Sequence, residues 1–420
     1  MEKIKINAYK ILRWSEKYAK TDMVYLASGG FWLLLGQGVI MVTGLIIAVA
    51  FANLVPKDTY GTYQFIMSIA VIISAFTLSG IGTTIITAVA KGRDGALRTG
   101  FKTQIIWSSG IFVAGLLFSA YYYINGNNIL ALSFLVIGTL SPFIEGFGLA
   151  KSYLLGKKYF KESAVYSIFR RLVLLTSIIT AISLTDNLVI IVSAYYGSSV
   201  ISGAILYWTV VIRHKLKHSE ENKMINYSKH LSLIKTFANI AGQADKILIF
   251  HFLGAVPVAV YTLAILPIKQ IESLYSLLYS LTFSKIGGIE FSKLKRILPP
   301  KVKSMFRVSV IILILYIIAA PYLFKIFFPS YTESVLISQI LALTLLSKPR
   351  SLYKQAFTAH RMKKEQYVIG ISSNILRVVL FLILLPIFGM WGLVCSLLLT
   401  EVYLNILIRY QFKHATLTKR

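Results

Sequence analysis

Residues 31–53 read FWLLLGQGVIMVTGLIIAVAFAN, a stretch without a charged side chain. A helix needs about 20 mostly apolar residues to cross the roughly 30 Å hydrocarbon core of a bilayer. The stretch therefore predicts a transmembrane helix. The segment before it is basic, but it has no short apolar core followed by a small-residue cleavage site, so it does not resemble a signal peptide. We expect the first helix to be retained.

Similar apolar runs recur along the whole chain. They lie near residues 60–80, 102–123, 128–149, 163–184, 187–212, 232–253, 257–283, 305–328, 333–356, 366–388 and 389–411. The chain of 420 residues is 56% hydrophobic and only 14% charged, and its mean hydropathy is +0.70. A water-soluble domain does not tolerate this composition. The sequence predicts an all-α integral membrane protein of about 12 transmembrane helices.

The basic residues are unevenly divided between the connections that alternate along this chain. The termini and the connections of one side hold 35 of the 44 lysines and arginines, whereas the other side holds only Lys57 and Lys325. Basic connections stay in the cytoplasm, so we expect a bacterial inner-membrane protein with both termini cytoplasmic. This distribution accounts for the net charge of +28 without a nucleic-acid partner, which would need the charge gathered on one accessible face.

Two parts of the first half of the sequence recur in the second half. Residues 156–174 align without gaps on residues 362–380, and residues 54–63 resemble residues 252–261. Repeats with an even number of spans have the same orientation and are related by an axis along the membrane normal. This predicts two pseudo-symmetric six-helix bundles around a central cavity. The predicted parts are a cytoplasmic amphipathic N-terminal segment (1–29), an N-terminal bundle (30–212), a cytoplasmic basic linker (213–231), a C-terminal bundle (232–412) and a cytoplasmic tail (413–420).

Several short patterns resemble the Wzx-type polysaccharide flippases. They are Leu54, Pro56, Tyr60-Gly61-Thr62-Tyr63 and Leu78-Ser79-Gly80-Ile81-Gly82 in the first half, and Asp245-Lys246-Ile247-Leu248, Leu253-Gly254 and Tyr261 in the second. The resemblance covers nearly the whole chain and implies the fold of the multidrug and toxin extruders, the MATE-like or MOP fold. The lipid II flippases of this superfamily usually carry two additional spans, which are absent from the predicted runs.

The resemblance also implies a function. Wzx-type flippases move undecaprenyl-pyrophosphate-linked oligosaccharide, an O-antigen or capsule repeat unit, from the cytoplasmic to the periplasmic leaflet during lipopolysaccharide or capsule biosynthesis. A polysaccharide polymerase and a chain-length regulator are the protein partners that such a role implies.

Seven cations fall inside the predicted spans: Arg170, Arg171, Lys246, Lys269, Lys348, Arg350 and Arg377. A charge at mid-span costs at least ~2.5–3.5 kcal/mol on insertion scales, so such residues normally face a cavity or a partner. Arginine's planar fork suits phosphate oxygens. We predict a cationic substrate site made of Arg170, Arg171, Lys246, Lys269 and Arg377.

Several of these charged residues can instead have a purely structural role. Lys269 and Glu272 are three residues apart and can pair with each other. Arg171 and Arg377 occupy equivalent positions in the two halves, and either can form an interhelical bond instead. Lys348 and Arg350 are expected to extend toward the cytoplasmic surface. Asp245 and Glu272 are the candidate ion-coupling residues, although Asp245 can equally pair with a cation on another helix.

Other chemical motifs are not found in the sequence. There is no phosphate-binding Gly-x-x-x-x-Gly-Lys-Ser/Thr loop, so we expect no ATP hydrolysis. The histidine pair His214 and His218 has no neighbouring acid, so no metal site is expected. We predict no catalytic residue and no cofactor.

Two other functions remain open. An exporter of cationic drugs from the same superfamily needs a site rich in acids and aromatic rings, whereas the seven cations compare with only four acids, Glu145, Asp245, Glu272 and Glu401. A membrane-embedded glycan polymerase or ligase usually carries a large outer loop with catalytic residues. The predicted outer connections are all short.

Overall fold

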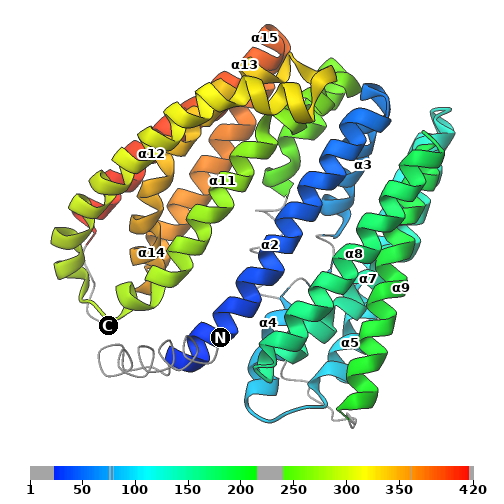
Figure 1. Cartoon of the computed structure of the whole chain (residues 1–420), viewed down its shortest axis with the longest axis horizontal. Helices are drawn as coiled ribbons and strands as arrows, with labels where there is room; N and C mark the ends of the chain where they lie inside the picture. The colour runs from blue at the N-terminus through cyan, green and yellow to red at the C-terminus, as the bar shows by residue number, and fades with distance from the viewer. Residues whose placement is uncertain (1–22, 75–76, 79, 215–239, 361, 416–420) are drawn as a thin grey trace. The chain divides into compact units, whose positions relative to one another are not determined.

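The computed structural model describes residues 23–74, 77, 78, 80–214, 240–360 and 362–415. All regular elements within these ranges are helical (Figure 1). Eight helices are long and apolar enough to cross a membrane, by length and composition. The predicted all-α membrane fold is confirmed, and the chain is a multi-pass membrane protein. Most of the predicted N-terminal segment and of the basic linker lies outside the described residues.

The chain forms two compact units, which are described separately. The first comprises Met1–Ala50 and Ala70–Asn239, and the second comprises Phe51–Ile69 and Ile240–Arg420. Residues 51–69, which belong to the N-terminal bundle in the predicted scheme, therefore group with the second unit. Direct backbone packing explains the grouping, because a Cβ atom added to Gly61 would lie 1.8 Å from the main-chain oxygen of Ala255.

Helices of different lengths build the first unit (Figure 1). They are α2 (Met23–Leu54) up to Ala50, α4 (Ile81–Ala90), α5 (Ala96–Trp107), α6 (Ser109–Ile124), α7 (Asn128–Gly156), α8 (Phe160–Leu184) and α9 (Leu188–Arg213). Helix α7 is central because it contacts α4, α5, α6, α8 and α9. Helices α6 and α7 approach closely at two glycines, where a Cβ atom on Gly115 would lie 2.5 Å from the Cα atom of Gly138. Small residues allow this kind of backbone approach in membranes.

Two predicted spans of the first unit are interrupted. The run predicted at 60–80 forms α3 (Lys57–Ile73), and the short apolar helix α4 follows as a separate element. The run at 102–123 is divided between α5 and α6 at Ser108. A buried polar cluster lies there, in which Gln104 donates to Thr77 at 2.6 Å and Thr77 lies 3.1 Å from the Ser108 hydroxyl. Apolar periodicity does not reveal such a break.

The second unit contains residues 51–69, the helical residues 240–253 and the remaining helices. These are α11 (Ala255–Gly287), α12 (Phe291–Phe327), η2 (Pro329–Tyr331), α13 (Ser334–Leu341), η3 (Ala342–Arg350), α14 (Ser351–Ala359) and α15 (Lys363–His414). The turn before α11 needs Gly254, whose φ of 91° lies in the left-handed region that favours glycine. The run predicted at 333–356 is continuous but changes from α to 3₁₀ geometry and back.

Helices α12 and α15 are longer than a single span. Helix α12 has 37 residues, about 55 Å at 1.5 Å per residue, and it begins 14 residues before the run predicted at 305–328. The basic residues Lys293 to Arg307, predicted to lie in a connection, are therefore on the first half of this helix. The 52 residues of α15 include Gly389 with φ 57° and ψ −139°, where the chain turns between the runs predicted at 366–388 and 389–411.

Candidate functional site

A cationic pocket lies inside the first unit. Its volume is about 240 Å³. It is lined by Ile40, Ile144, Phe147, Gly148, Ala150, Lys151, Tyr166, Ser167, Arg170, Arg171, Leu174, Tyr195, Ser199, Gly203 and Leu206. The lining contains three cations and no acid. The predicted residues Arg170 and Arg171 are thus brought together with Lys151, which comes from α7.

Helix α2 positions Arg171. The Arg171 Nε atom donates to the Thr43 hydroxyl at 3.1 Å, and this hydroxyl donates in turn to the main-chain oxygen of Val39 at 2.7 Å. Gly44 lies beside the guanidinium, since a Cβ atom at this position would be 3.5 Å from Arg171 Nη2, an ordinary van der Waals contact. The interhelical bond expected as an alternative for Arg171 is present. It uses one of the five N–H donors, and the same side chain also lines the pocket.

Arg170 is less restrained than Arg171. In the described part of the chain it forms no ion pair or hydrogen bond, and Glu145 and the Tyr195 hydroxyl act on it electrostatically. Helix α8 begins at Phe160, so both arginines lie about 15 Å along it. With no ion pair or hydrogen bond to a described residue, the Arg170 guanidinium keeps its N–H donors for other partners.

Adjacent residues of the second unit have different partners. The Lys246 ammonium donates to the Gln64 side-chain oxygen at 2.8 Å. The Asp245 carboxylate accepts a hydrogen bond of 2.7 Å from the Tyr261 hydroxyl. The two side chains point apart, as their positions on a helix require. Asp245 forms no ion pair among the described residues, so the alternative of a cation on another helix is not observed.

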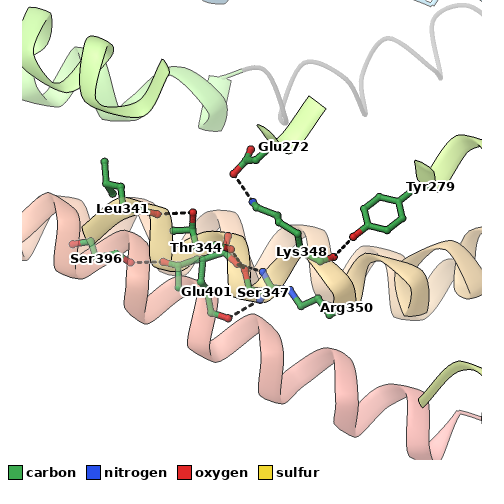
Figure 2. Close-up of polar contacts among 10 residues, drawn as sticks. Glu272, Tyr279, Leu341, Thr344, Ser347, Lys348, Arg350, Ser396 and Glu401 are labelled. Carbon is green, nitrogen blue, oxygen red and sulfur yellow. Dashed lines mark hydrogen bonds and ion pairs between the residues drawn. The ribbon is translucent and has the colours of Figure 1, made fainter. Parts of the chain in front are cut away.

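Glu272 pairs with Lys348 rather than with Lys269. The Lys348 Nζ atom lies 2.7 Å from Glu272 Oε1 (Figure 2), whereas the exposed Lys269 has no ion-pair partner in the described residues. The alternative in which Lys269 pairs with Glu272 is therefore not observed. The helical spacing permits it, but a cation on the 3₁₀ segment reaches the carboxylate instead.

Arg350 forms a second ion pair, with Glu401. Its side chain is 6% exposed, and its two terminal nitrogens donate to the Glu401 carboxylate and to the main-chain oxygen of Glu401 (Figure 2). Ser347 donates to the same carboxylate, and Tyr279 donates to the main-chain oxygen of Lys348 at 2.6 Å. The expectation that Lys348 and Arg350 extend toward the surface is wrong. Acids on neighbouring helices neutralise both cations within the unit.

The intramembrane cations thus fall into two groups. Lys348 and Arg350 pair with acids. The five predicted site residues, Arg170, Arg171, Lys246, Lys269 and Arg377, form no ion pair among the described residues. The Arg377 Nε atom is buried without a hydrogen-bond partner in this part of the chain. A buried donor without a partner is costly, so the Arg377 guanidinium can gain free energy from a further hydrogen-bond partner.

Two polar residues of these sites were not predicted from the sequence. Lys151 lies just beyond the run predicted at 128–149, but α7 continues to Gly156 and carries Lys151 into the pocket lining. Gln64 is uncharged and therefore gave no signal, yet it is the partner of Lys246.

The sequence and fold comparisons define the class of the protein. The described helices superpose on transporters of the MOP superfamily. An inward-facing multidrug resistance MATE transporter gives a TM-score of 0.66 at 13% identity, with 90% of this chain and 98% of that chain covered. The lipid II flippase MurJ, in an inward closed conformation, gives 0.64 at 14% identity and covers 91% and 87%. A MOP superfamily transporter from Pyrococcus furiosus gives 0.62 at 13% identity and covers 93% and 95%.

A match to one protein family is more specific than these similarities of fold. Residues 26–283 match the family described as polysaccharide biosynthesis protein. The chain belongs to this family, because the match spans more than half of its length. The comparison with curated proteins gives no match. The resemblance noted in the sequence is therefore confirmed at the level of family and fold.

Proposed function

We propose that the protein is a flippase, which moves undecaprenyl-pyrophosphate-linked oligosaccharide from the cytoplasmic to the periplasmic leaflet by alternating access. One observation carries the proposal: five intramembrane cations have no acid partner among the described residues, although a charge in a span is costly. An anionic headgroup compensates this cost during transport. The proposed location is the bacterial inner membrane with both termini cytoplasmic.

The pocket of the first unit suits a diphosphate. Three cations surround about 240 Å³ without a lining acid, and guanidinium groups hold phosphate oxygens through two parallel hydrogen bonds. Tyr166 and Tyr195 add hydroxyl groups at the same wall. In this proposal Arg170 and Arg171 contact the pyrophosphate, whereas Lys246, Lys269 and Arg377 contact it or an acidic sugar at another stage of transport.

Asp245 is a better ion-coupling candidate than Glu272. Its carboxylate accepts from the Tyr261 hydroxyl and from the main-chain N–H of Lys246, and the hydroxyl can remain hydrogen-bonded to either protonation state of a carboxyl group. Glu272 is instead paired with the Lys348 ammonium, which already occupies its carboxylate. We propose Asp245 as the residue that binds a coupling proton or sodium ion.

An exporter of cationic drugs is the first alternative. The MATE transporters with this fold are described as multidrug resistance proteins, but a pocket with three cations repels a cationic drug. The Pyrococcus furiosus transporter is described as having a binding pocket of reverse polarity, which suggests a different function for it. The shared fold therefore does not establish which class of substrate this chain transports. The three cations of the pocket favour an anionic substrate.

A membrane-embedded glycan polymerase or ligase is the second alternative. The described connections expected on the outer side are short: residues 55–56, 125–127, 185–187, 254 and 328–333. None of these has the length of a catalytic loop. These short connections favour the translocation of a glycan precursor over its polymerisation.

Removal of the two pocket arginines tests the proposal. A host strain deleted for the gene is complemented with R170Q/R171Q, with R170K/R171K, or with K363Q, which changes an exposed cation on α15. We expect R170Q/R171Q to reduce surface glycan at least tenfold, since each lost charge-assisted contact is worth ~1.5–3 kcal/mol, and to accumulate the lipid-linked repeat unit. K363Q should support normal glycan. Normal surface glycan with R170Q/R171Q at normal protein level would refute the assigned contacts.

A further inference from the structure

A second basic pocket lies in the second unit, at the end where its basic residues gather. It has a volume of about 230 Å³ and is lined by Lys295, Pro299, Tyr353, Arg409, Phe412 and Lys413. These residues come from α12, α14 and the last turns of α15. Three of the six are cations and none is an acid. This pocket is distinct from the proposed transport site of the first unit, with which it shares no residue.

Packed aromatic rings form a rigid floor for the pocket. Phe412 lies 4.3 Å from Tyr353 and 5.6 Å from Phe291, measured between ring centroids. All three rings are at most 6% exposed and belong to the hydrophobic core of this unit. The cations above them differ in exposure, since Lys295 is half-buried whereas Arg409 and Lys413 are exposed. A fixed floor with cations around it holds a bound anion in a defined place.

Lys295 also neutralises the end of α15. Its ammonium donates to the main-chain oxygen of Lys413 at 2.9 Å. The last carbonyl groups of a helix carry partial negative charge, which opposes an anion. The Lys295 ammonium reduces this repulsion. Arg409 and Lys413 have no ion pair within the described residues, so both remain free to bind an anion.

An exposed apolar stripe leads away from the pocket along α15. Leu399, Val402 and Ile406 are 50%, 55% and 65% exposed. Together with Arg409 they are spaced three, four and three residues apart, which places them on one face of the helix. Tyr410, at 62% exposed, lies beside the arginine, as aromatic residues commonly do at the membrane interface. A single lipid molecule can place its acyl chain on the stripe and its phosphate in the pocket.

We propose that this pocket binds the phosphodiester headgroup of an anionic phospholipid, whose acyl chain follows Leu399, Val402 and Ile406. Basic pockets between transmembrane helices are known to bind lipid headgroups. A free phosphate ion would use the cations equally well, but it would not use the stripe. A lipid therefore needs both the pocket and the stripe, whereas a free phosphate ion needs only the pocket.

Native mass spectrometry of the purified full-length chain tests the proposal. The protein is mixed with phosphatidylglycerol or phosphatidylcholine of identical acyl chains, and the fraction of protein that retains one lipid is measured. We expect phosphatidylglycerol to be retained in preference to phosphatidylcholine. R409Q/K413Q should weaken phosphatidylglycerol binding at least tenfold, whereas the control K363Q/K364Q, which removes two exposed cations at the start of the same helix, should change it less than twofold.

Two further measurements separate the lipid from other anions. I406N leaves every cation in place and should weaken phosphatidylglycerol binding several-fold, because it interrupts the stripe. Inorganic phosphate at millimolar concentration should not displace the lipid. The proposal is overturned if both double variants weaken binding equally, if R409Q/K413Q has no effect while monodisperse, or if inorganic phosphate displaces the lipid.

Discussion

Lys57 at the start of α3 forms an ion pair with Glu333 beside α13, with Nζ 2.7 Å from Oε1. The ammonium also lies 4.9 Å from the centre of the Tyr331 ring. The two charged side chains are 31% and 50% exposed, so their attraction contributes less than about 1 kcal/mol. The same segment also packs closely against the second unit. The Phe65 and Phe250 rings stack with centroids 3.9 Å apart, and Gly61 packs directly against the backbone of Ala255. Residues 51–69 are thus held in the second unit mainly by close packing.

Gly61→Leu should separate α3 from the start of α11, because a side chain there has no space. The readout is a short cross-link between K57C and E333C on a C395S background, which removes the single native cysteine. We expect the yield to fall by about fivefold or more, as overpacking of this kind costs ~1–3 kcal/mol. Gly242→Leu is the matched control, since a Cβ at Gly242 meets nothing within 4 Å. An unchanged yield with G61L would contradict the packing argument.

Thr43→Val should impair transport without removing a charge. The valine has the shape of threonine but cannot accept from Arg171 Nε, so the guanidinium loses its fixed orientation. Loss of a hydrogen bond to a charged group costs ~1.5–3 kcal/mol, and we expect a several-fold fall in affinity for undecaprenyl pyrophosphate. Thr43→Ser keeps the hydroxyl and should bind normally. Equal affinities for T43V and T43S would show that Arg171 does not need this partner.

Arg350→Met and Glu401→Leu should each destabilise the protein far more than the double variant. Either single change leaves a charge inside the second unit without its partner, at a cost of about 3–5 kcal/mol, whereas removing both charges is often neutral. The midpoint of thermal unfolding in detergent, followed by intrinsic fluorescence, measures this difference. The corresponding changes at Lys57 and Glu333, which form an exposed pair, should lower the midpoint little. Additive effects at Arg350 and Glu401 would exclude direct coupling.

Gly392→Val should prevent the normal turn within α15. A Cβ atom at Gly392 would lie 1.9 Å from the main-chain oxygen of Leu384. Gly389→Ala should also destabilise the turn, by about 1–3 kcal/mol, because its backbone conformation is strained for other residues. The yield of monodisperse protein after detergent extraction measures both effects. Gly370→Ala, which meets nothing within 4 Å, should leave the yield unchanged; a similar loss in this control would indicate a general sensitivity of the helix.

The apolar runs and the charged residues were sufficient to predict the helical membrane fold. Length and hydropathy specify a span because unpaired backbone groups are not tolerated in lipid. The five predicted site residues could be selected because a charge in such a run is rare and costly. The boundary predicted between the runs 366–388 and 389–411 coincides with the turn at Gly389, whose backbone conformation other residues avoid.

Partners of the charged residues depended on tertiary contacts instead. Sequence separation allowed Lys269 to pair with Glu272, but Lys348 from the 3₁₀ segment pairs with that carboxylate instead. Gln64 and Lys246 are 182 positions apart and meet only because α3 packs within the second unit. A local pattern specifies which residues enter the membrane. Which charges remain free to bind an anion is decided by the packing of helices distant in sequence, because only that packing brings an acid close enough to neutralise them.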